Sequence, residues 1–155
     1  MDNYFMMSIR FNKSAPEDFG LINTEETNIF IRQADNTLWE KCNMYDFGWG
    51  KENGYRRIPL LEFSELVNLI LHTNSENDKY GAAAQILERH TDKLLELCQN
   101  IFKEKSQLKQ YKEFFEILRL DEPINRSTTM GKTNLQISND YEQWVEISRL
   151  VKKTI

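Results

Sequence analysis

The residues that could build a nucleophilic or metal site are few in this chain. It has two histidines, His72 and His90, and two cysteines, Cys42 and Cys98. A serine or cysteine nucleophile needs a nearby base such as histidine, and zinc usually takes several Cys or His ligands at close spacing. Both cysteines lie on apolar helical stripes. We therefore predict buried thiols outside any disulfide, no catalytic residue, no metal and no cofactor.

Two glycine-containing segments resemble phosphate-binding loops without meeting their requirements. Met130–Thr133 matches the end of a P-loop, but Arg126 stands where that motif needs its first glycine. Gly48–Lys51 lacks the glycine spacing of a dinucleotide-binding turn. Carboxylates are plentiful, yet no pair is singled out for acid–base chemistry. A small enzyme that uses carboxylates is therefore the second alternative here, not the main hypothesis.

One cluster of aromatic and basic residues is typical of a recognition surface. Trp, Tyr and Arg are enriched at binding hot spots because they combine a large contact area with a polar tip. The segment around the Gly48–Gly50 loop is rich in these types. The candidate protein-binding residues are Asp46, Trp49, Lys51, Tyr55, Arg56 and Arg57.

Composition and charge fit one cytosolic domain. The chain has 155 residues, of which 40% are hydrophobic and 28% charged, and its net charge is −4. This acidic balance argues against nucleic-acid or anionic-membrane binding and is compatible with a basic protein partner. Asp2 and Arg10 do not fit a secretory signal, and no apolar run has the length of a membrane span. We expect a cytoplasmic location.

The stretch Ser75–Asn100 predicts two consecutive helices around which the other elements pack. Apolar or small residues recur at helical spacing on both sides of a break near His90 and Thr91. Ser75 and Asp78 have the spacing of a capping box. The small residues of Gly81–Ala84 predict the point where a neighbouring helix crosses closely.

The first third of the chain is harder to assign. Alternation over Tyr4–Phe11 predicts a short strand. Thr24–Phe47 has apolar residues at steps of about four, and we expect a helix there; the alternative is a strand over Asn28–Gln33 followed by a shorter helix after Asp35. Gly48–Ile58 is expected to be a loop.

Further helices are expected after Pro59, after Ser106 and after Asn139. Together these elements predict a mainly α fold, either an antiparallel helical bundle or a short stack of helical hairpins, with a possible short N-terminal β segment. The expected single domain has an N-terminal strand and loop (1–23), a helical core (24–120), an irregular loop (121–137) and a closing helix (138–155).

Three stretches resemble small bacterial immunity proteins of polymorphic or contact-dependent toxin systems. They are LWEKCNMYDFGWGK, RRIPLLEFSELVNLI and KYGAAAQILERH, and the resemblance covers roughly residues 35 to 98. It implies a small, cytosolic, non-enzymatic protein that blocks a toxin by tight binding, and it supplies no individual functional residues. The leading hypothesis is therefore an immunity protein that binds a toxin domain. The first alternative is a helical-hairpin adaptor or regulator with a housekeeping partner.

Overall fold

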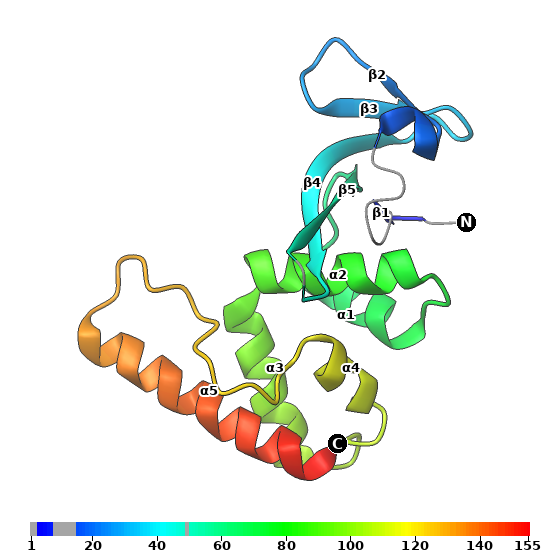
Figure 1. Ribbon diagram of the computed structural model, residues 1–155. Helices are drawn as coiled ribbons and strands as arrows, with labels where there is room; N and C mark the ends of the chain where they lie inside the picture. Colours follow the sequence, from blue (N-terminus) through cyan, green and yellow to red (C-terminus); the bar gives the residue numbers. More distant parts are fainter. Residues whose placement is uncertain (1–2, 8–14, 49) are drawn as a thin grey trace. The chain divides into compact units, whose positions relative to one another are not determined.

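The computed structural model describes residues 3–7, 15–48 and 50–155. The chain divides into two compact units, residues 1–85 and 86–155. Unit 1 carries the strands and the first helices, and unit 2 carries the remaining helices (Figure 1). The boundary falls inside one helix, α2.

Unit 1 is built on a five-stranded antiparallel sheet in the order β1-β5-β4-β3-β2. Its strands are β1 (Phe5–Met7), β2 (Leu21–Asn23), β3 (Ile29–Arg32), β4 (Leu38–Asp46) and β5 (Lys51–Ile58). A short 3₁₀ helix, η2 (Pro16–Phe19), precedes β2. Two α-helices follow the sheet, α1 (Phe63–His72) and α2 (Glu76–Arg89). The predicted mainly α fold is therefore wrong, because the chain combines an antiparallel sheet with helices.

The expected helix over Thr24–Phe47 is replaced by β3 and β4. Its four-residue spacing is misleading because Phe30 and Leu38 belong to different strands and point to opposite faces of the sheet. The alternative prediction of a strand over Asn28–Gln33 agrees with β3. Its second part, a shorter helix after Asp35, is wrong because strand β4 occupies that segment. The predicted loop Gly48–Ile58 is mostly strand β5, paired with β4 over its whole length. Of the predicted strand Tyr4–Phe11, β1 covers Phe5–Met7, and residues 8–11 lie outside the described residues.

One face of the sheet carries a tightly buried core, which we call the sealed face. Trp39 and Tyr55 are 0% and 1% exposed, and the ring of Tyr55 meets Phe19 and Phe30 edge-on. Phe19 comes from η2, so this short helix helps to cover the face. The buried members of the cluster are Met6, Leu21, Phe30, Trp39 and Tyr55.

The β1 edge of the sheet is attached to α2. The Asp78 carboxylate accepts hydrogen bonds from the backbone N–H groups of Asn3, Tyr4 and Phe5, at 3.1, 2.9 and 2.9 Å. A Cβ at Gly81 would collide with the ring of Phe5. The small residues of α2 thus admit a strand phenylalanine, where we predicted a crossing helix.

The predicted pair of consecutive helices is confirmed. α2 ends at Arg89 and α3 (Thr91–Glu104) begins two residues later, so the break lies at His90. At the start of α2 the Asp78 amide donates to Ser75 Oγ at 3.2 Å, which confirms Ser75 as the cap, while the Asp78 carboxylate binds the β1 amides and the Ser75 amide donates to Thr73.

Unit 2 contains the end of α2 with α3, α4 (Lys112–Ile117) and α5 (Asn134–Thr154). Phe102 and Phe115 stack with ring centroids 5.2 Å apart. The closing helix begins at Asn134, earlier than predicted, because Thr133 caps it by accepting from the Gln136 amide. In the preceding segment the Arg126 guanidinium donates to the Arg119 and Glu122 carbonyls and lies over the Trp144 ring.

Candidate interaction surface

Three of the predicted binding residues, Asp46, Trp49 and Lys51, belong to the β4–β5 turn or flank it in the sequence. Asp46 Oδ1 accepts hydrogen bonds from the backbone N–H groups of Gly48 and Gly50, at 2.7 and 3.1 Å. Asp46 also pairs with Lys51 in the strand register. Asp46 therefore shapes the turn. Trp49 lies outside the described residues.

Tyr55 is not available to a partner. It lies in the core of the sealed face, and burial raises the pKa of its phenol. The negative charges of the nearby Glu17 and Asp18 carboxylates raise this pKa further. Its predicted role as a binding residue would require a surface position, so this part of the predicted surface is not assembled.

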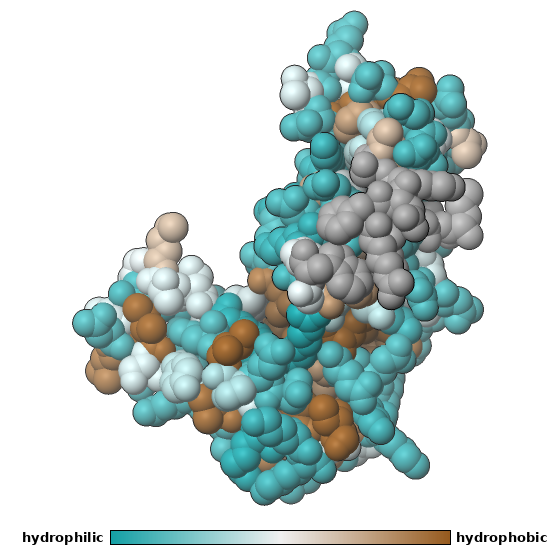
Figure 2. Space-filling view, in the orientation of Figure 1, coloured by the Kyte–Doolittle hydropathy of each residue, from teal (hydrophilic) through white to brown (hydrophobic). Residues whose placement is uncertain are grey.

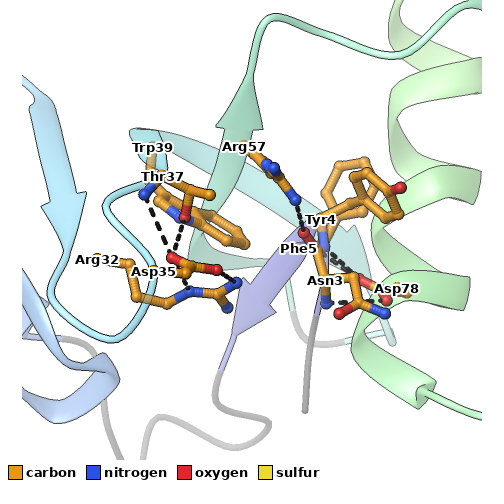
Figure 3. Close-up of polar contacts among 9 residues, drawn as sticks. All are labelled: Asn3, Tyr4, Phe5, Arg32, Asp35, Thr37, Trp39, Arg57 and Asp78. Atoms are coloured by element: carbon orange, nitrogen blue, oxygen red, sulfur yellow. Dashed lines mark hydrogen bonds and ion pairs between the residues drawn. The ribbon is translucent and has the colours of Figure 1, made fainter.

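The two arginines of the predicted site point to opposite sides of the sheet. The Arg56 guanidinium pairs with the Glu40 carboxylate at 2.6 Å. Arg57, on the same face as Tyr55, lies over the Tyr4 ring at 5.6 Å and donates to the Asn3 carbonyl at 3.3 Å (Figure 3). Because adjacent residues of a strand face opposite ways, the aromatic and basic cluster of the sequence is split between two faces.

Figure 3 also shows a polar network that braces the sealed face. Arg32 binds the Asp35 carboxylate through two nitrogens, at 3.1 and 2.5 Å, and its guanidinium lies 4.8 Å from the Trp39 ring centroid. The Thr37 hydroxyl donates to Asp35 and accepts from the Trp39 indole N–H. The hydrogen bonds from Arg32 and then Thr37 hold the pKa of Asp35 well below its usual value.

The opposite face of the sheet carries an exposed row of aliphatic side chains. In the strand register Ile22 pairs with Ile31, Ile31 with Leu38, and Leu38 with Ile58, so one line of branched residues crosses β2, β3, β4 and β5. Ile22 is 45% and Leu38 43% exposed, while Ile31 and Ile58 are half-buried. We call these four residues the aliphatic row and this side of the sheet the open face.

The next line of paired residues on the open face is polar where it crosses the middle strands. It contains Ile29, then the ion pair of Glu40 with Arg56, then Phe5 at the end covered by α2. The aliphatic row is thus bordered by a neutralised ion pair. Apolar patches with polar rims are typical of protein-binding sites. Of the predicted binding residues, Arg56 alone borders this surface among those that the structure describes.

Little in the sequence indicates the aliphatic row. Its four residues belong to four strands and lie far apart in the chain, so only the strand register brings them together. The one local sign is the Ile29-Phe30-Ile31 triplet, whose outer residues share a face when it is a strand.

A groove along α1 is the nearest approach to a catalytic arrangement. It has a volume of about 640 Å³ and is lined by one helical face with Glu65, Asn68, Leu69 and His72, together with Tyr4. Among the residues that the structure describes, no group of three or more His, Cys, Asp or Glu is placed to hold a metal ion. The groove therefore offers one imidazole and one carboxylate on an exposed surface.

Unit 2 also exposes apolar side chains. Met130 is 89% and Leu135 72% exposed, and hydrophobic and weakly polar residues gather over the first half of α5 and the loop before it (Figure 2). Nearby, Lys132 forms an ion pair with Asp140 at 2.6 Å. In the P-loop-like segment, the lysine is thus held by a carboxylate and Thr133 caps a helix.

Comparisons of the chain with protein-family models, with characterised proteins and with solved structures found no match. Over the described residues, no helix combines the length and the apolar character that crossing a membrane requires.

Proposed function

We propose that this chain is a non-catalytic protein-binding module that acts as an immunity protein, neutralising a toxin domain by binding it directly. The observation that carries the proposal is the aliphatic row on the open face. Solvent-exposed aliphatic side chains in a continuous line are unfavourable in water and gain free energy when a partner covers them. The resemblance of residues 35–98 to immunity proteins supports the same reading.

The partner is expected to be basic. The chain carries 24 acidic and 20 basic residues, and complementary charge speeds association and disfavours wrong partners. The polar border of the row, where Arg56 already neutralises Glu40, leaves its centre free of net charge. Leu38 lies in the middle of the row and is the best single residue to change.

The test compares the natural chain with Leu38→Asp. Each is tagged and used to capture proteins from the organism's own lysate, and the captured partner is then expressed in cells with and without the chain. We expect a basic partner that stops growth when expressed alone and is harmless beside the natural chain. Leu38→Asp should weaken its binding by about 2 kcal/mol or more, close to thirtyfold in Kd, and should fail to protect.

Leu38→Ala serves as the matched control because it shortens the side chain without burying a charge. It should bind with intermediate affinity. A non-toxic housekeeping partner would contradict immunity and favour an adaptor. Capture of no partner would contradict the proposal. Protection by Leu38→Asp equal to that by the natural chain would show that the partner does not bind through the aliphatic row.

A further inference from the structure

We propose that β2 is the docking edge of the sheet, to which an extended, lysine- or arginine-flanked segment of the partner protein adds as a further antiparallel or parallel strand. This inference rests on the proposed function and specifies which part of the partner is recognised and how. Strand addition at a sheet edge supplies affinity through backbone hydrogen bonds and specificity through alternate side chains.

Within the residues that the structure describes, the hydrogen-bond pattern of β2 leaves the outer side of this strand without a paired strand. The Gln33 amide donates to the Gly20 carbonyl and the Thr24 amide donates to the Ile29 carbonyl. Because hydrogen-bonded pairs alternate along an antiparallel ladder, Ile22 also bonds toward β3, while Leu21 and Asn23 direct their N–H and C=O groups away from it. No described strand pairs with that side of β2.

The two edges of the sheet differ in this respect. At the β1 edge, the Asp78 carboxylate of α2 takes up the amides of Asn3, Tyr4 and Phe5. At this end of β1, the amides that an added strand would need already have an acceptor. Open edges invite pairing with other chains, so the contrast singles out β2.

The aliphatic row could add apolar contacts to the backbone hydrogen bonds of an added strand. The row reaches the edge at Ile22, which is 45% exposed and pairs with Ile31. A strand beside β2 would place every second side chain on the open face, next to Ile22. Apolar residues at those positions would extend the row across one more strand and cover its exposed end.

The charges around β2 determine which segment fits. Glu17 and Asp18 in η2 precede the strand, Glu25 and Glu26 follow it, and all four are exposed. The one base between residues 15 and 37, Arg32, is buried and bound to Asp35. A segment with Lys or Arg on both sides of its apolar residues therefore meets opposite charge at each end of β2.

The probe is a synthetic peptide of alternating valine and threonine with two lysines at each end. It is added to the full-length, isotope-labelled chain, and amide hydrogen exchange is followed by NMR. We expect the amides of Leu21 and Asn23 to exchange about tenfold more slowly with the peptide bound. The Ile22 amide, which already bonds to β3, should change little.

Two matched pairs isolate the edge and the charge. Asn23→Pro removes the outward N–H at an edge position that tolerates proline, while Asn23→Ala keeps it. The double variant Glu25→Lys with Glu26→Lys reverses the charge beside β2, while Glu96→Lys with Glu104→Lys makes the same change of net charge at exposed positions of α3. We expect at least about tenfold weaker peptide binding for the first member of each pair and unchanged binding for the second.

The outcomes separate this inference from the proposed function. Absence of peptide binding, or binding that leaves Leu21 and Asn23 unprotected and is unaffected by Asn23→Pro, overturns strand addition. If Leu38→Asp still abolishes capture and protection in that case, the proposed function stands with a different mode of contact. If the edge is protected but the captured partner does not stop growth when expressed alone, strand addition stands and the proposed function fails.

Discussion

The two faces of the sheet in unit 1 are made by the same strands but differ in exposure along the aliphatic row. On the sealed face Trp39 is fully buried, and its indole N–H is bonded to Thr37. On the open face its neighbour Leu38 leaves 43% of its surface in solvent, in line with Ile22 and Ile31. The difference shows that apolar character alone does not identify a core residue. Of two neighbouring apolar residues in one strand, Trp39 is buried in the core and Leu38 is exposed to solvent.

Trp39→Ala should strongly destabilise the fold, because Trp39 lies in the core of the sealed face. Removing a fully buried indole leaves a cavity among Phe30, Tyr55 and their neighbours, and we expect the free energy of unfolding to fall by about 3–5 kcal/mol. Urea unfolding at 25 °C measures this. Leu38→Ala is the matched control and should cost less than about 1 kcal/mol. Similar losses at both positions would contradict the distinction between the faces.

Asp78→Ala tests the edge that α2 covers. The variant leaves the amides of Asn3, Tyr4 and Phe5 without their shared acceptor, and we expect a loss of about 2 kcal/mol or more. Hydrogen exchange should show the Phe5 amide exchanging much faster, while amides of β2 keep their natural rates. If β2 amides accelerated equally, the two edges would not be independent.

Asp35→Asn tests the network beneath Trp39 through pH. Arg32 and Thr37 lower the pKa of Asp35 in the folded chain below its value of about 4 in the unfolded chain. The charged Asp35 carboxylate therefore stabilises the fold at pH values above its pKa in the unfolded chain. This stabilisation is progressively lost as the pH falls below that value toward the lower pKa of the folded chain. We expect the Tm of the natural chain to exceed that of the variant at pH 7 and the gap to shrink between pH 5 and pH 3.

A gap in Tm that is constant or grows toward pH 3 would show that the amide substitution acts through packing and not through charge.

The thiols of Cys42 and Cys98 should differ in their reactivity toward a maleimide. Burial raises the pKa of Cys98 to about 12, while Cys42 is half-buried on the open face. A maleimide should therefore label Cys42 in the native chain and Cys98 only after unfolding, which mass spectrometry can follow. Cys42→Ser should abolish native labelling. Native labelling of Cys98 would contradict its burial.

Local sequence signals predicted the helices better than the sheet. The cap at Ser75 and Asp78 and the break at His90 depend on residues a few positions apart, and both are present in the structure. The sheet depends on pairs such as Ile31 with Leu38 and Leu38 with Ile58, which sequence periodicity does not reveal. The four-residue spacing of Phe30 and Leu38 then favoured a helix that pairing overrides.

The predicted binding residues are separated in the structure for a related reason. Tyr55, Arg56 and Arg57 are consecutive, and a loop could have presented them together. As part of β5 they alternate, so Tyr55 enters the core and Arg56 alone borders the aliphatic row. Composition singled out this segment of the chain but could not assign its residues to faces.

The most direct test of the open face is one paired measurement on Leu38→Asp: its Tm and its affinity for the captured partner. If the face exists to bind, the Tm should stay within a few degrees of the natural value, because Leu38 is already solvated, while affinity falls about thirtyfold. A collapse in Tm comparable to that of Trp39→Ala would show that Leu38 belongs to the core. Unchanged affinity with an unchanged Tm would show that the partner does not use this face.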